Sequence, residues 1–142
     1  MSGLEVLSIV ANILQLLDFS QKILSRAVEL RAGKDVGDAF LGINDMLPPI
    51  RHAVNNTKKR IDNKEIDEET SKALLPTHRG VERVLEDLKT ILAKFTLEAD
   101  ASKWEVVWKA TRSVRQEKKV KDIQETLMRY VGVLTLSHAE AA

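Results

Sequence analysis

The N-terminal part of this chain limits its possible folds most strongly, because it is apolar on most sides of a helix. Apolar residues recur at helical spacing over about 4–30, and two stripes between Val6 and Leu17 cover more than half of the helix circumference. Such a helix is either central in a bundle or placed in lipid. One stripe contains Leu7, Val10, Leu14, Leu17, Leu24 and Val28, and the other contains Val6, Ile9, Ile13 and Leu16.

The middle of the chain predicts two further long helices. The second begins near Asp35, and its apolar stripe runs across Pro48 and Pro49, which predict a kink or a short break. An acidic loop follows over 62–69. The third helix is expected over about 68–95, and Pro76 in its early part predicts that the first turns form a separate piece. The second stripe consists of Val36, Phe40, Ile43, Leu47, Ile50, Val54 and Ile61, and the third of Leu74, Val81, Leu85, Leu88, Leu92 and Phe95.

The C-terminal part predicts two shorter helices after a connector over 96–102. Trp104, Val107, Trp108 and Thr111 mark one face of the first. The second follows a join around 114–119, and the tail over 138–142 is expected to be frayed. The stripe of this last helix consists of Val120, Ile123, Leu127, Tyr130 and Leu134.

The composition agrees with one all-α domain. The chain has 142 residues, which suits a single domain over 1–142, and its 4% aromatic content requires an aliphatic core. Its 6 glycines and 3 prolines are too few for the many tight turns of an all-β fold. We therefore expect an up-down bundle of four to five helices, with kinked second and third helices and loops short enough for antiparallel neighbours.

The sequence offers no catalytic or metal site. It contains no cysteine, no nucleophile elbow, no P-loop and no dinucleotide-binding fingerprint, so we expect neither an enzyme nor a cofactor. The histidines His52, His78 and His138 lie on different expected elements, and we interpret them as surface or boundary residues. The formal net charge of +1 gives no global field that would attract nucleic acid.

Polar residues interrupt the apolar surface of the first helix. Asn12 and Gln15 are close on one side, and Glu5 falls near that side because it precedes Asn12 by two turns. Together with Asp18 they predict a narrow polar seam. Such a seam could line a pore or could face solvent.

A basic segment with two tryptophans precedes the last helix. Trp104 and Trp108 share one helical face within a strong excess of lysine and arginine over 102–121. This combination is typical of the headgroup region of an anionic membrane or of an acidic partner. In the simpler interpretation, the tryptophans cap the core and the basic residues are solvated. The residues of this surface are Lys103, Trp104, Trp108, Lys109, Arg112, Arg115, Lys118 and Lys119.

Several stretches in order resemble a known family. They are GLEVLSIVANILQLLDFSQKIL, INDMLPPI, IDNKEIDEETSKALLP and SKWEVVWKATRSVRQEKKVKDIQETLMRYVGVLTL, and the likeness that they mark extends over essentially the whole chain. The sequence resembles the SesA-type, HeLo-like N-terminal domains of fungal NACHT and other STAND NTPases, relatives of the NLR receptors. This resemblance implies the N-terminal part of a larger receptor, with a nucleotide-binding domain downstream in the same polypeptide.

The resemblance also implies a function. In HeLo-like domains the apolar N-terminal helix inserts into the membrane, and the receptor's self-association exposes it. The expected outcome is regulated cell death of the heterokaryon-incompatibility type, with anionic lipid as a partner and movement from the cytoplasm to the plasma membrane. The alternative is an adaptor that stays folded and recruits a protein partner. The residues carried over are Leu4, Val6, Leu7, Ile9, Val10, Ile13, Leu14, Leu16, Leu17 and Phe19, with Glu5 and Asp18 as the acidic positions.

Overall fold

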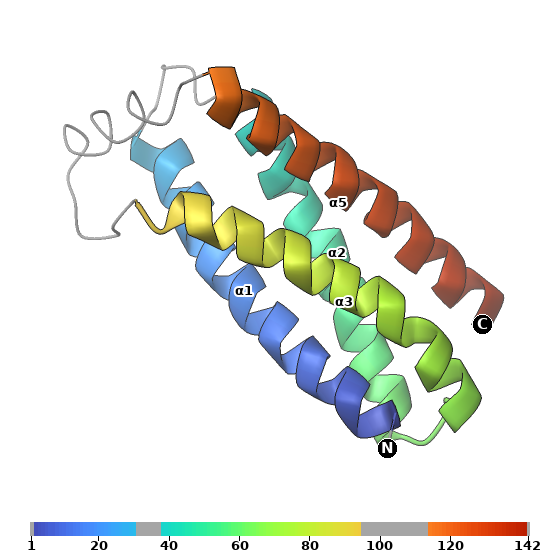
Figure 1. The fold of residues 1–142 in the computed structure, drawn as a ribbon. Coiled ribbons are helices and arrows are strands. Elements are labelled where there is room, and N and C mark those ends of the chain that lie inside the picture. The colour runs from blue at the N-terminus through green and yellow to red at the C-terminus, as the bar shows by residue number, and fades with distance from the viewer. Residues whose placement is uncertain (1, 31–37, 95–113, 142) are drawn as a thin grey trace.

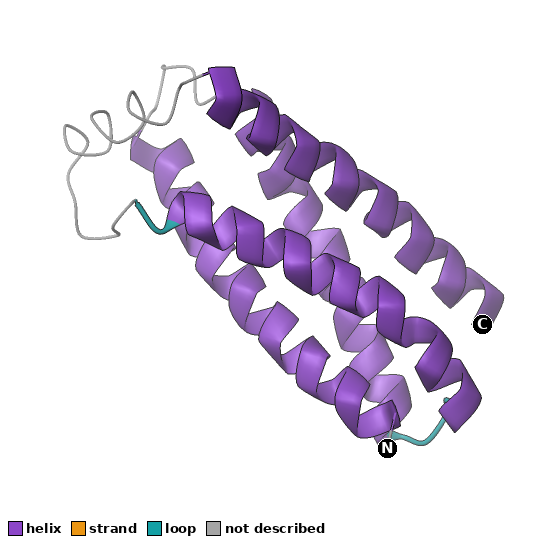
Figure 2. Ribbon diagram, in the orientation of Figure 1, coloured by secondary structure: helices purple, strands orange, loops and turns teal. Residues whose placement is uncertain are grey.

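The computed structural model describes residues 2–30, 38–94 and 114–141, and their side chains over 4–29, 40–94 and 117–135. The described residues form four helices and no strand, in the order α1 (Ser2–Leu30), α2 (Asp38–Asp62), α3 (Glu68–Leu92) and α5 (Val114–Ala141) (Figure 2). The all-α prediction is confirmed for this part of the chain. The helix expected around 104–111 lies outside the described residues.

The four helices alternate in direction along the chain. α1 and α3 run one way, and α2 and α5 run the other (Figure 1). α1 packs most extensively against α3 and next against α2, while α5 packs against α2 and α3. α2 and α3 contact each other little, although only residues 63–67 join them. The expectation that a short loop makes them close neighbours is therefore wrong, since a loop of this length can reach about 16 Å and cross the bundle.

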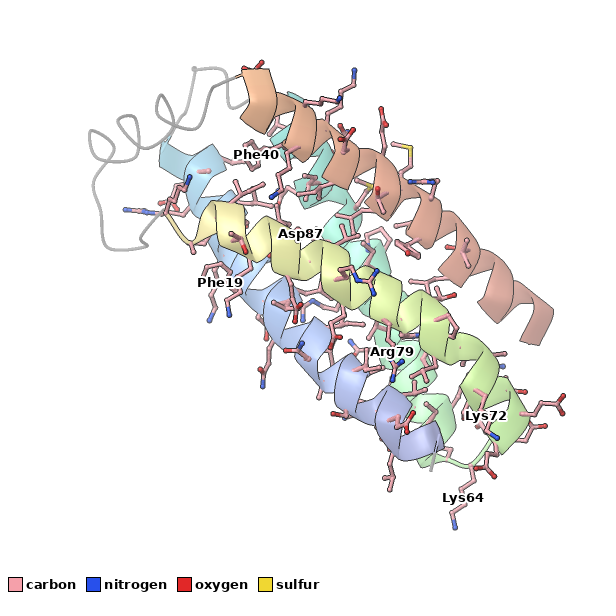
Figure 3. The ribbon with its side chains drawn as sticks, in the orientation of Figure 1. Phe19, Phe40, Lys64, Lys72, Arg79 and Asp87 are labelled. Atoms are coloured by element: carbon pink, nitrogen blue, oxygen red, sulfur yellow. The ribbon has the colours of Figure 1, made fainter. Side chains whose placement is uncertain are left out.

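The core is one aliphatic cluster to which all four helices contribute. The sequence stripes locate it well, because nearly every member with a described side chain is buried or half-buried. Val28 is the exception: it is 41% exposed, and Ala27 takes the inward position instead. Figure 3 shows Phe40 on α2 at the end of the bundle where α5 begins.

The prolines do not break their helices. α2 is continuous over Asp38–Asp62 with Pro48 and Pro49 inside it, and α3 contains Pro76 in the same way. Pro48 and Pro49 are exposed, so water can reach the backbone carbonyls that each proline leaves without an amide donor. Leu47 and Ile50 are fully buried on the opposite face and hold the helix against the core. The predicted breaks are wrong, whereas the kinks stay a prediction.

The last helix is longer than expected. α5 is a single helix over Val114–Ala141, so the expected join around 114–119 is wrong, while the frayed tail over 138–142 stays a prediction. The buried residues Val120, Ile123, Leu127 and Leu134 recur at helical spacing on one face, and this packing stabilises a continuous helix.

The start of α3 is capped by one of the acidic residues that we expected in a loop. Asp67 is the N-cap, and its Oδ1 accepts a hydrogen bond from the Thr70 backbone N–H at 2.7 Å. Hydrogen bonds from the Thr70 side chain and backbone lower the pKa of the Asp67 carboxyl below its ordinary value. The cap therefore contributes stability above the unfolded-state pKa and loses it as pH falls through the folded-state pKa.

The end of α2 contains a residue in left-handed conformation. Lys64 has a φ of 58°, and its N–H donates to the Ile61 carbonyl at 3.0 Å, while Glu65 N–H donates to the Arg60 carbonyl at 2.8 Å. This is the Schellman pattern, in which glycine is preferred at the left-handed position. Figure 3 shows Lys64 in the loop that leads to α3.

We expect Lys64→Gly to raise the free energy of unfolding by about 0.5–1 kcal/mol, because glycine adopts a positive φ without the steric cost of a Cβ. Urea denaturation of the whole chain measures it. The matched control is Lys58→Gly, an exposed position inside the same helix, which should lose about 1 kcal/mol. A loss at both positions would contradict the left-handed geometry.

Candidate functional site

The residues predicted to enter a membrane form the inner face of α1. Five of the ten are buried at 0–4% exposure, namely Val6, Val10, Ile13, Leu16 and Leu17. Another four are half-buried, namely Leu7, Ile9, Leu14 and Phe19, and only Leu4 is exposed, at 62%. In this structure most of the candidate residues thus belong to the core or pack against it, on the side of α1 that faces α3 and α2.

The outer face of α1 is polar. It carries small or polar side chains at heptad-like spacing, so the helix is amphipathic as well as rich in apolar residues. A transfer of α1 to lipid must therefore accommodate charged groups on one side. The exposed polar and small residues of this face are Glu5, Ser8, Ala11, Gln15, Asp18, Lys22, Ser25 and Glu29.

The four residues of the expected polar seam have different surroundings. Glu5 and Gln15 are exposed. Asn12 points to α3, where its Nδ2 donates to Glu82 Oε2 at 2.9 Å and to Glu86 Oε1 at 3.4 Å. Asp18 pairs with Arg51 of α2 at 2.7 Å. Asn12 and Asp18 can face different helices because they are separated by about 120° around the helix axis. The structure therefore leaves Glu5 and Gln15 to solvent and gives Asn12 and Asp18 partners on two different helices.

Polar and cationic contacts also flank the buried face of α1. The same Nη2 of Arg51 that pairs with Asp18 donates to Gln21 Oε1 at 3.1 Å. The ammonium of Lys89 on α3 lies 5.7 Å from the centroid of the Phe19 ring, within cation–π range. Figure 3 shows Phe19 on α1 beside the C-terminal half of α3. These contacts link α1 to both of its neighbours.

The basic segment with tryptophans is described only at its end. Lys118 and Lys119 are exposed on the first turns of α5. The backbone of Arg115 belongs to α5, but its side chain is outside the described part. Lys103, Trp104, Trp108, Lys109 and Arg112 also lie outside the described residues.

One histidine was placed wrongly by the sequence. His78 is fully buried, not a surface or boundary residue, and its Nδ1 lies 2.9 Å from the Leu74 carbonyl, to which the Nδ1–H tautomer donates. The spacing of His78 from Val81 and Leu85 puts it on the α3 stripe, and this signal could have located it. His52 is exposed, and the His138 side chain is outside the described part.

Among the described residues, no group of three or more possible ligands is placed to hold a metal ion.

One helix of the described chain is long and apolar enough to cross a membrane. This is α1 over Leu4–Glu29, and 39% of its most apolar window is buried inside the bundle. A core helix of a soluble protein can pass the same test of length and composition. α1 is therefore both the apolar helix predicted from the sequence and a helix of the bundle core.

A family model matches residues 10–134, which include all of α2 and α3 and most of α1 and α5. Its description is the SesA N-terminal domain on NACHT NTPases and P-loop NTPases. The chain belongs to the SesA family. SesA is a non-catalytic family, and its position on NTPases agrees with a nucleotide-binding domain in the same polypeptide. No curated protein and no solved structure gave a match.

Proposed function

We propose that this SesA domain is the signalling module of an NLR-like NTPase and acts on membranes through α1. At rest α1 is a core helix. When receptors cluster, several copies of α1 leave their bundles and enter the plasma membrane from the cytoplasmic side, and the damage induces regulated cell death. The observation that carries the proposal is the amphipathic build of α1, with a continuous buried apolar face and an exposed polar face.

The energetic balance of the two states supports a transfer. Burying a Leu, Ile or Val side chain contributes roughly 1.5–3 kcal/mol, whether protein core or hydrocarbon receives it. The inner face of α1 consists of such residues, so the docked and inserted states differ by much less than the sum of either set of contacts. Clustering of receptors raises the effective concentration of neighbouring copies and can supply the difference.

The polar outer face supports self-association in the inserted state. A single helix crossing the bilayer would place groups such as Asp18 and Lys22 in hydrocarbon, and each central charge costs about 2.5–3.5 kcal/mol on insertion scales. Copies that turn these faces toward one another, or a helix that lies in the interface, avoid this cost. The exposed Lys118 and Lys119 add attraction to anionic headgroups.

The test uses Leu4, because it is the exposed member of the predicted set. Leu4→Lys should leave the bundle folded, since the side chain is 62% exposed, but should reduce leakage of anionic vesicles about tenfold. Leu14→Lys is a weaker choice, because Leu14 is half-buried against the core and its substitution also perturbs folding. Circular dichroism checks the fold, and dye release from phosphatidylserine vesicles measures the leakage.

The matched control is Leu41→Lys. Leu41 is 38% exposed on α2, so this variant adds the same charge outside α1 and should leave leakage unchanged. Equal leakage by the wild type, Leu4→Lys and Leu41→Lys would contradict the proposal.

The second candidate function is a folded adaptor that recruits a partner. The observation in its favour is the deep packing of α1, whose residues Val6, Val10, Ile13 and Leu17 are at 0% exposure. Hydrogen exchange separates the two functions. Protection of Leu4–Leu17 amides that persists with anionic vesicles favours the adaptor, and its loss or new lipid contact favours membrane entry.

A further inference from the structure

Arg51 joins α2 to two positions on α1. Its Nη2 donates to Asp18 at 2.7 Å and to Gln21 at 3.1 Å, and these two acceptors lie one turn apart. The Arg51 side chain is only 29% exposed, so its charge is partly desolvated. We call this contact the Arg51 clasp. A bridge to two successive turns is specific for one axial position of α1.

Asn12 joins α1 to two positions on α3. Its amide nitrogen lies 2.9 Å from a Glu82 oxygen and 3.4 Å from a Glu86 oxygen, and these carboxylates are one turn apart. Like charges at this helical spacing repel each other, and the Asn12 amide donates to both. We call this contact the Asn12 clasp. It lies on the α3 side of the buried face, while the Arg51 clasp lies on the α2 side.

The apolar face supplies most of the attraction that holds α1, but that attraction has little directionality. A slide of α1 by one turn, about 5.4 Å, would keep much apolar contact and break both clasps. α5 packs against α2 and α3, and these pairs do not involve α1. A local opening of α1 therefore leaves part of the bundle packed.

We propose that the two clasps form a release latch, which fixes the register of α1 and sets how often this helix opens while α5 stays docked. The release latch determines how often α1 opens within the folded bundle. Its link to membrane entry rests on the function proposed above.

The sharpest test is Asn12→Asp in the whole chain. This nearly isosteric change replaces a donor with a carboxylate facing Glu82 and Glu86, so three like charges meet in one place. We expect the amides of α1 to exchange about tenfold faster than in the wild type, because the repulsion raises the equilibrium constant for opening of α1 about tenfold. Amides of α5 over 120–134 should keep their wild-type rates. Hydrogen exchange with mass spectrometry measures both helices in one sample.

Rescue tests whether the effect comes from this contact. Adding Glu82→Gln and Glu86→Gln to Asn12→Asp restores donors opposite the new carboxylate, and exchange in α1 should return to within about twofold of wild type. Equal acceleration of α1 and α5, or no rescue, would overturn the Asn12 clasp as a latch, because the change would then be a general loss of stability.

The Arg51 clasp has a milder variant and a matched control. Arg51→Met keeps the apolar stem and removes the donors, and we expect about threefold faster exchange of α1 alone. Glu29→Gln breaks the Arg26–Glu29 pair at 3.2 Å, which lies within α1 and joins it to nothing else. Glu29→Gln should change the exchange rate of the α1 amides by less than about twofold. If the control matches Arg51→Met, the Arg51 clasp does not hold α1.

Vesicles distinguish failure of the latch from failure of the membrane function. Faster opening of α1 together with more leakage from anionic vesicles supports both. Faster opening without a change in leakage supports the latch and overturns membrane entry. Unchanged exchange in Asn12→Asp and Arg51→Met overturns the latch, whatever the vesicles show.

Discussion

Leu17→Ala is expected to lower the free energy of unfolding by about 3 kcal/mol, one of the largest single-site losses in this chain. Leu17 is at 0% exposure in the middle of the core cluster, where α1 packs against its neighbours. The substitution removes buried methyl groups and leaves a cavity that the surrounding helices fill only in part, and both effects reduce stability. Urea denaturation followed by circular dichroism measures the change.

Leu4→Ala is the control on the same helix. Leu4 is 62% exposed, so truncation should change the free energy of unfolding by no more than about 0.5 kcal/mol. The same chemical change thus gives losses that differ severalfold at two positions of one helix. Similar losses at both positions would mean that α1 does not dock through the face described above.

The sequence predicted the inward faces of the helices because one physical rule governs them. An amphipathic helix buries the residues that recur every three or four positions, and Ile43, Leu47, Ile50 and Val54 on α2 follow this rule without exception. The rule loses accuracy near helix ends, where the last members of a stripe can rotate out of the core. Val28 shows this, since it is 41% exposed near the end of α1.

The proline positions show why local rules failed for the helix breaks. The sequence gives the missing amide donors of Pro48 and Pro49 but not the side of the bundle on which the freed carbonyls lie. Both rings are exposed in the structure and so lie on the solvent side of the helix, while packing of Leu47 and Ile50 on the opposite face keeps the helix continuous. Tertiary packing therefore overrode a local signal.

The side-chain contacts of α1 with its neighbours could not be predicted from the sequence, for a different reason. The division of Asn12 and Asp18 between two sides of α1 follows from helical geometry, but their partners depend on which helices are neighbours. That neighbour relation departs from the simplest up-down order, since α2 and α3 contact each other little. The family description places SesA domains on NTPases, and only the assembled bundle identifies Arg51, Glu82 and Glu86 as polar partners of α1.

Gly80→Ala is expected to lower the free energy of unfolding by about 1–3 kcal/mol, although alanine is the better helix former. Gly80 lies on α3 directly beneath the Tyr130 ring of α5, and an added Cβ would meet the Tyr130 Oη and Cζ atoms and approach Cε1 to 3.1 Å. The ring is rigid, so the two helices must separate or the ring must leave its place. This steric cost exceeds the gain of about 1 kcal/mol in helix propensity.

Two other glycines provide matched controls in the same denaturation experiment. Gly132→Ala should raise the free energy of unfolding by about 0.5–1 kcal/mol, because nothing lies within 4 Å of the added Cβ and only propensity changes. The change in the free energy of unfolding caused by Gly42→Ala should lie between those of Gly80→Ala and Gly132→Ala. The added Cβ meets the flexible end of the Gln124 side chain, which can move aside. If Gly80→Ala stabilised the chain as Gly132→Ala does, Tyr130 could not lie against α3. Contacts other than Gly80–Tyr130 would then have to hold α3 and α5 together while α1 opens.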